Sequence, residues 1–296
     1  MALVATLIAN PSNPVLSSTI AEKAADAVKA SGLYWLADGI ACDIALKDGT
    51  DLTEAETALR AAIEGLPIDL AIQDADVRRK KFLIADMDST MIGQECIDEL
   101  AAEVGLKEKV SAITARAMNG EIAFEPALRE RVALLKGLPV TVVDEVIAKR
   151  ITLTPGGPEL IATMKAKGHY TALVSGGFTV FTSRIAATLG FHENRANILI
   201  EDNGALAGAV EEPILGKQAK VDALIDITGK LGIDPADVIA VGDGANDLGM
   251  LELAGSGVAL HAKPAVAAQA KIRIDHGDLT ALLYLQGYRK ADFVAP

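Results

Sequence analysis

The order of short apolar runs in residues 81–296 constrains the fold more than any other feature. Three such runs each end at small or acidic residues and are followed by a helix-like stretch; they lie at residues 82–85, 171–174 and 238–241. Short buried runs that alternate with helices are typical of a parallel sheet with helices on both faces. Two further strands are expected at residues 257–260 and 272–274. The sequence therefore predicts an α/β fold with a doubly wound parallel sheet.

Residues 95–150 interrupt this pattern, because they are poor in strand signals and rich in helix formers. We expect a helical insertion directly after the first strand of the sheet. Later in the chain, residues 197–201 and 205–210 flank Asp202-Asn203-Gly204, which predicts a β-hairpin.

Residues 1–78 are expected to form a separate small domain, and residues 79–296 the larger one. The apolar patterns predict the order β-α-β-β-α-β, the split βαβ arrangement. The expected strands are 2–9, 33–37, 40–46 and 66–72, and the expected helices are 15–30 and 52–64. The basic run Arg78-Arg79-Lys80-Lys81 is interpreted as a solvated linker.

The composition excludes several classes of protein. The net charge is −12, and the basic run at 78–81 is the only basic cluster, so we expect no nucleic-acid partner. The apolar residues 2–9 are too few to span a bilayer and follow no basic segment, so we expect neither a membrane partner nor a signal peptide. The two cysteines, Cys42 and Cys96, lie far apart and suit a reducing compartment, so a cytoplasmic protein is expected.

The first apolar run ends at Asp86-Met87-Asp88-Ser89-Thr90. Residues i and i+2 of an extended chain point the same way, so Asp86 and Asp88 are expected to face one spot. Two close carboxylates repel each other unless a cation or a shared proton lies between them. One could attack a phosphoryl group while the other transfers a proton. The alternative is a solvated turn or a helix cap.

The other two strand ends also carry polar groups. Ser175-Gly176-Gly177 precedes a helix predicted over 178–189, where free N–H groups favour an anion. The segment 242–247, Gly-Asp-Gly-Ala-Asn-Asp, supplies two more carboxylates, which suit Mg²⁺. Lys217 and Lys220 could offer positive charge to a phosphoryl group. Ligands of open parallel sheets bind beyond the carboxyl ends of the strands, so these sets are expected to form one site.

In this order the motifs resemble those of the haloacid dehalogenase (HAD) superfamily of phosphohydrolases, and more closely the phosphoserine phosphatases within it. The resemblance covers about residues 80–290. It implies Mg²⁺-dependent hydrolysis of the small molecule O-phospho-L-serine to L-serine and phosphate, the last step of serine biosynthesis. It implies that Asp86 forms an aspartyl phosphate and that Asp88 acts as acid and base. The implied metal ligands are Asp86, the backbone carbonyl of Asp88, and Asp243, with Asp247 in support.

The resemblance also implies the contacts to the phosphate. Ser175 and the amide of Gly176 correspond to groups that bind the phosphoryl oxygens, and Asn246 to one that touches the phosphate end. Lys220 fits the family's lysine better than Lys217, which stays an alternative.

The insertion at about 95–150 corresponds to the family's helical cap. Glu95 corresponds to the glutamate that binds the substrate ammonium, and Arg131 to the arginine that binds its carboxylate. Met118 and Phe124 correspond to apolar residues that close over the substrate.

The domain of residues 1–78 resembles an ACT domain, a module that usually pairs and senses amino acids. The resemblance implies a homodimer and a possible amino-acid effector, although residues 10–14 lack the glycine that such ligand sites often use. Two other functions remain open. One is a HAD phosphatase that acts on phosphohomoserine or a small sugar phosphate, and the other is a non-catalytic amino-acid sensor.

Overall fold

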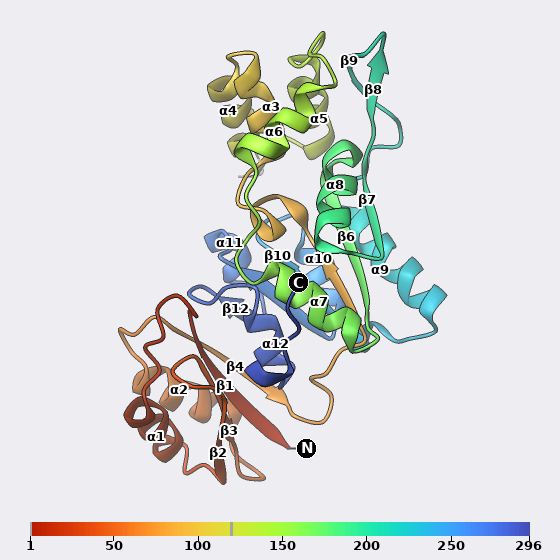
Figure 1. Ribbon diagram of the computed structural model, residues 1–296. Helices are drawn as coiled ribbons and strands as arrows, with labels where there is room; N and C mark the ends of the chain where they lie inside the picture. Colours follow the sequence, from red (N-terminus) through yellow and green to blue (C-terminus); the bar gives the residue numbers. More distant parts are fainter. Residues whose placement is uncertain (1, 119–120) are drawn as a thin grey trace.

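The computed structural model describes residues 2–118 and 121–296 of the chain. The N-terminal unit lies at one end, a parallel sheet with its helices in the middle, and a group of four helices at the other end (Figure 1). Among the described residues, no helix has the length and apolar character needed to cross a membrane.

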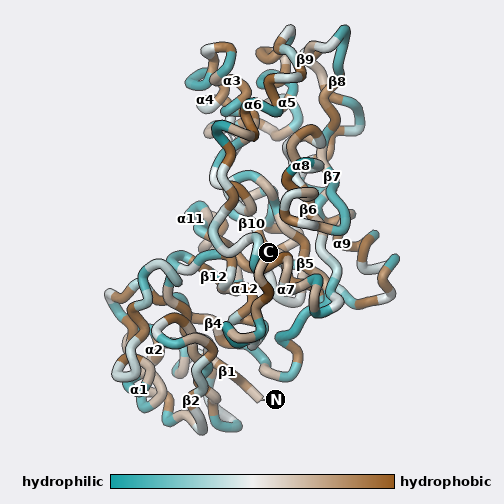
Figure 2. Tube along the Cα trace, viewed as in Figure 1, coloured by the Kyte–Doolittle hydropathy of each residue, from teal (hydrophilic) through white to brown (hydrophobic). Residues whose placement is uncertain are grey.

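The large sheet has six parallel strands in the order β12-β11-β10-β5-β6-β7. Their bounds are β5 (Phe82–Ala85), β6 (Tyr170–Phe178), β7 (Glu193–Asn197), β10 (Val238–Gly242), β11 (Ser256–Leu260) and β12 (Ile272–Ile274). All residues of the central strands β5 and β10 are buried, and the chain at β5 is brown, that is hydrophobic, in Figure 2. The predicted α/β class and parallel sheet are confirmed.

Helices cover both faces of this sheet. Leu83 and Ala85 of β5 pack into the cluster that includes α7, α8 and α12, whereas Phe82 and Ile84 pack against α9 and α10. The helix bounds are α7 (Gly157–Ala166), α8 (Thr179–Leu189), α9 (Lys217–Leu231), α10 (Leu248–Leu253), α11 (Pro264–Ala267) and α12 (Ala281–Leu285), with short 3₁₀ turns at Pro235–Asp237 and Lys290–Asp292. Alternate residues of one short strand are therefore buried on opposite sides, which explains why its sequence is apolar throughout.

The N-terminal unit has the expected β-α-β-β-α-β order, with strands paired antiparallel as β2-β3-β1-β4. Its elements are β1 (Leu3–Ala9), α1 (Ser18–Ala27), β2 (Gly32–Ala37), β3 (Ala41–Ala45), α2 (Leu52–Ala62) and β4 (Ile68–Asp74). Helices α1 and α2 cover one face. Ile8 and Ala71 on the other face join the apolar cluster that contains α12, so the unit is packed against the larger part of its own chain.

The prediction that residues 78–81 form a solvated linker is wrong for Arg78 and Lys80, whereas Arg79 and Lys81 are exposed. Arg78 pairs with the buried Asp43 at 2.6 Å. The ammonium of Lys80 is buried and donates to the carbonyls of Val77 and Ala236. Arg79 lies over the ring of Tyr288. These basic groups are satisfied by partners in both units, so they connect them.

The helical group at the far end consists of α3 (Cys96–Glu103), α4 (Lys107–Met118), α5 (Phe124–Ala133) and α6 (Val142–Arg150). A hairpin of β8 (Leu199–Asp202) and β9 (Ala205–Val210) packs against α5 (Figure 1). Arg129 of α5 also pairs with Glu212 just beyond the hairpin, at 2.7 Å. The hairpin was expected from the sequence, but its place beside the helical group was not.

Candidate active site

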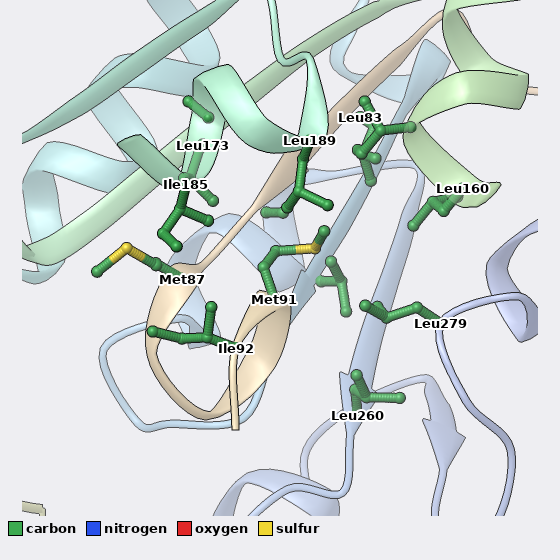
Figure 3. Close-up of a cluster of buried hydrophobic side chains, with 14 of the residues drawn as sticks. Leu83, Met87, Met91, Ile92, Leu160, Leu173, Ile185, Leu189, Leu260 and Leu279 are labelled. Carbon is green, nitrogen blue, oxygen red and sulfur yellow. The ribbon is translucent and has the colours of Figure 1, made fainter. Parts of the chain in front are cut away.

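The segment after β5 places two acidic side chains at the carboxyl end of the sheet. A short helical turn spans Met87–Met91, with Asp86 as its N-cap. Met87, Met91 and Ile92 are buried in the apolar cluster beneath the turn (Figure 3). These apolar anchors fix the backbone, while Asp86 and Asp88 line a pocket on the other side.

Lys220 of α9 lies beneath the pocket between two carboxylates. Its ammonium is 2.6 Å from Asp86 Oδ1 and 2.6 Å from Asp247 Oδ1. The lysine is 1% exposed. Burial alone would lower the pKa of Lys220, but Asp247 and Asp86 outweigh it and raise this pKa above its ordinary value. The ammonium therefore stays charged. Lys217, the alternative, lines the pocket but is exposed.

Three buried carboxylates meet at this point. Asp86, Asp243 and Asp247 each offer an oxygen within 4.8 Å of the others. Burial raises the pKa of Asp86 and of Asp243, and Asp247 raises both further. Lys220 supplies one positive charge to this group, and Lys263, 3.3 Å from Asp243, supplies another. Acidic oxygens held this close suit a hard divalent cation. The side chain of Asp88 is outside the group, and the expected role of its backbone carbonyl stays a prediction.

Asp88 is held by neutral donors. Its Oδ1 accepts the backbone N–H of Cys96 at 2.8 Å, and its Oδ2 accepts the hydroxyl of Ser175 at 3.1 Å. Burial raises the pKa of Asp88 above its ordinary value, and these hydrogen bonds oppose the rise. A raised pKa favours the protonated form, which is the form that a general acid needs.

Ser175 lies inside β6, not at a turn that opens a helix. The predicted helix start at residue 178 is wrong by one residue, because β6 continues through an irregular pairing with β7 to Phe178. The hydroxyl of Ser175 accepts the N–H of Gly177 at 2.8 Å. A Cβ on Gly176 would lie 3.0 Å from the ring of Phe124, and one on Gly177 would lie 2.9 Å from Asp88 Oδ2. Glycine therefore permits the close approach of these groups.

The pocket has a volume of about 290 Å³ and lies between the sheet and the helical group. It brings together most of the residues that the sequence singled out, from six different elements or loops: Asp86, Asp88, Glu95, Phe124, Arg131, Ser175, Gly176, Asp243 and Asn246. Lys220 and Asp247 lie directly beneath it. The side chain of Met118 lies outside the part of the chain that is described.

Glu95 has a pKa close to neutral pH. Burial and, after it, the charge of Asp88 raise the pKa of Glu95 to about 7. The hydroxyl of Ser89 donates to Glu95 Oε1 at 2.8 Å and opposes the rise. A cationic group that entered the pocket beside Glu95 would favour its ionised form.

Arg131 lines the same pocket as Glu95 and is 6% exposed. Its Nε donates to the carbonyl of Ala127, and its Nη1 donates to the hydroxyl of Thr114 at 2.9 Å. The pocket thus holds a partly buried acid and a buried base, and no ion pair within 4.0 Å involves either side chain among the described residues.

Sequence reasoning missed three groups of the site. Lys263 follows β11, the neighbour of β10, so the rule that adjacent strand ends meet could have located it. Thr114 and Cys96 carried no signal, because a threonine or a cysteine in an amphipathic helix resembles any other residue on the buried side of that helix.

Comparison with known proteins shows which family this chain belongs to. The sequence model of the haloacid dehalogenase-like hydrolases matches residues 83–252. The chain belongs to this hydrolase family.

Within the family, the chain is 46% identical over 226 residues to a protein of Polaromonas sp. named phosphoserine phosphatase. The match covers 75% of this chain and 96% of that protein. A solved HAD family hydrolase from Salmonella enterica serovar Typhi has a TM-score of 0.84 and 30% identity, with 96% and 98% of the two chains covered.

A structure described as the phospho-aspartyl intermediate analogue of phosphoserine phosphatase matches with a TM-score of 0.66 and 44% identity. This match covers 70% of this chain and 98% of the other.

Proposed function

We propose that this HAD hydrolase is a phosphoserine phosphatase that converts O-phospho-L-serine to L-serine and phosphate. The observation that carries the proposal is the pairing of Glu95 and Arg131 in one pocket above Asp86. Phosphoserine has an ammonium, a carboxylate and a phosphate. The ammonium matches Glu95, the carboxylate matches Arg131, and the phosphate matches the floor, where Lys220 lies beside the carboxylates that are proposed to hold a divalent cation. The relatives named phosphoserine phosphatase support the same assignment.

Asp86 is the proposed nucleophile. Its carboxylate oxygen attacks phosphorus, the bond from phosphorus to the serine oxygen breaks, and Asp88 gives its proton to that leaving oxygen. In the second half, Asp88 takes a proton from water as the water oxygen attacks phosphorus. The bond between Asp86 and phosphorus then breaks and releases phosphate. The raised pKa of Asp88 suits it to both transfers.

Other groups of the chain orient the phosphate and offset its charge. The ammonium of Lys220 lies 2.6 Å from Asp86 and would offset negative charge on a phosphoryl group that this aspartate accepts. The hydroxyl of Ser175, the amide of Gly176 and Asn246 line the same wall as hydrogen-bonding partners. Preorganised charge of this kind is usually the largest contribution to catalysis of such transfers.

Mg²⁺ is the proposed cofactor, held by Asp86, Asp243 and the backbone carbonyl of Asp88, with Asp247 in support. The three buried carboxylates within 4.8 Å of one another fit such an ion. The ion would neutralise negative charge on the phosphoryl oxygens.

Comparison of three substrates tests the function. Phosphoserine should be hydrolysed with a kcat/KM far above that of O-phosphoethanolamine, which lacks the carboxylate, and of glycerol phosphate, which lacks both amino-acid groups. Equal values for the three substrates would refute the amino-acid pocket and favour a general phosphatase. Arg131→Met should reduce the preference for phosphoserine over phosphoethanolamine, since only the first has a group for the guanidinium.

The N-terminal unit is proposed to pair two copies of the chain through the open edge of β2. Among the described residues no strand pairs with this edge, whereas the sheet face that carries Ala71 is already covered. Light scattering of the purified chain gives its mass, and a monomer at micromolar concentration would contradict the pairing.

Binding of an amino-acid effector to the N-terminal unit is also proposed. A cytoplasmic location is proposed because Cys42 and Cys96 are buried free thiols.

A further inference from the structure

Arg131 depends on a neutral neighbour for its orientation. The guanidinium has five N–H donors, and the structure gives one of them to the carbonyl of Ala127, at 3.1 Å, and one to Thr114 Oγ1, at 2.9 Å. Ala127 belongs to the same helix, α5, and lies one turn earlier. Thr114 belongs to α4 and is therefore the contact that fixes the guanidinium relative to another helix.

Thr114 is itself held in place by other groups of the helical group. It is 4% exposed, and its hydroxyl lies 3.2 Å from Asp98 Oδ1 and 3.1 Å from the carbonyl of Val110. The hydroxyl has a single hydrogen, so it donates to one of these oxygens while its own oxygen accepts from Arg131. Asp98 Oδ2 accepts the hydroxyl of Ser111 at 2.6 Å, which holds the carboxylate on the same side of α4.

We propose that Thr114, supported by Asp98, is the positioning residue that sets the preference of this pocket for substrates with a carboxylate. The inference rests on the proposed function and assigns a role to two residues outside the expected site. Helices α3, α4 and α5 contribute Asp98, Thr114 and Arg131 in turn, so the chain of hydrogen bonds crosses the helical group and ends at the pocket.

The charge of Asp98 determines the direction in which the hydrogen bonds from Arg131 through Thr114 to Asp98 are donated. A carboxylate that accepts from the hydroxyl leaves the oxygen of Thr114 free to accept from the guanidinium, and neighbouring hydrogen bonds strengthen one another at low polarity. Asp98 also raises the pKa of Arg131, which burial lowers first. The remaining N–H donors of the guanidinium are available to a substrate carboxylate. A planar guanidinium binds a carboxylate through two parallel hydrogen bonds, and this requires the correct orientation of its plane.

Thr114→Val tests the proposal, because valine keeps the shape and removes the hydroxyl. We expect the ratio of kcat/KM for phosphoserine to that for phosphoethanolamine to fall about 10-fold, a loss typical of one hydrogen bond to a charged group. The change should lie in KM for phosphoserine, with kcat nearly constant. Phosphoethanolamine keeps the phosphate and ammonium, so its KM should stay within about 2-fold of the value for the unaltered enzyme.

Three further variants separate positioning from structure. Thr114→Ser keeps the hydroxyl and should restore the preference. Asp98→Asn should give an intermediate loss and serves if Thr114→Val does not fold. Thr228→Val is the matched control, since Thr228 is also a buried helical threonine but bonds only to carbonyls of its own helix, at Leu224 and Ile225. It should leave the preference unchanged.

The outcomes distinguish the two proposals. If the unaltered enzyme prefers phosphoserine and both Thr114→Val and Asp98→Asn keep that preference, the positioning role is wrong and the proposed function stands. Equal KM increases for both substrates would also overturn it, because a general disturbance of the helices acts on every substrate. If the unaltered enzyme shows no preference, the proposed function fails, and the positioning role fails with it.

Discussion

Glu95→Gln should stabilise the protein at alkaline pH. Burial and Asp88 raise the pKa of Glu95 from 4.5 to about 7. Between these values the folded state keeps a proton that the unfolded chain has released, so the free energy of unfolding falls as pH rises through this window. Each unit of pKa shift corresponds to 1.36 kcal/mol, which gives a loss of about 3 kcal/mol above pH 7. Glutamine carries no charge and can still accept from Ser89, so the variant avoids this loss.

Urea unfolding at pH 5 and at pH 8, with EDTA and without substrate, measures the effect. The variant should be more stable than the unaltered protein by up to about 3 kcal/mol at pH 8, and the difference should shrink towards pH 5. The variant should also show a raised KM for phosphoserine, because it lacks the charge that is proposed to pair with the substrate ammonium. A stability difference that is the same at both pH values would refute the reasoning, as would a variant that is less stable at pH 8.

Three other predictions concern the floor of the pocket. Asp86→Asn should abolish turnover of phosphoserine while the circular dichroism spectrum stays unchanged; residual activity above about 1% would contradict a covalent role. Lys220→Met should abolish turnover and lower the free energy of unfolding at pH 8 by about 3–5 kcal/mol, because Asp86 and Asp247 lose the charge they share; unchanged urea unfolding would argue against that shared pairing. EDTA should abolish activity, and added Mg²⁺ should restore it and raise the melting temperature; full activity in EDTA would exclude the proposed cofactor.

The parallel sheet was predictable where burial on both faces forces a strand to be apolar. Residues 82–85 and 238–241 are of this kind, and the structure places them at the centre of the sheet. Strand β7 at the edge escaped prediction. Its sequence Glu-Asn-Arg-Ala-Asn has no apolar period, because Glu193 bonds outward to Tyr170 and Arg195 to Asp226. Backbone pairing with β6, which leaves no trace in hydropathy, defines it.

The basic run at 78–81 shows a second limit of sequence reasoning. Charge normally indicates exposure, yet Lys80 is 4% exposed because two backbone carbonyls accept from its ammonium. One of these carbonyls, that of Ala236, belongs to a distant part of the chain, and no local pattern reveals it. Strand-end residues such as Asp86 and Asp243 could be grouped from sequence because the topology of a parallel sheet brings them to one edge.

The carboxyl groups of the pocket differ in what surrounds them, and this difference separates their chemistry. Asp86 and Asp243 belong to the group of three oxygens that suits a cation, so a bound divalent ion would favour their ionised forms. Asp88 lies outside that group and is held by a backbone N–H and a hydroxyl, while burial keeps its pKa raised. A bound cation would therefore favour the ionised form of Asp86, whereas burial favours the protonated form of Asp88. The proposed two-step hydrolysis needs this combination, because its first half requires attack by Asp86 and protonation of the leaving oxygen in the same event.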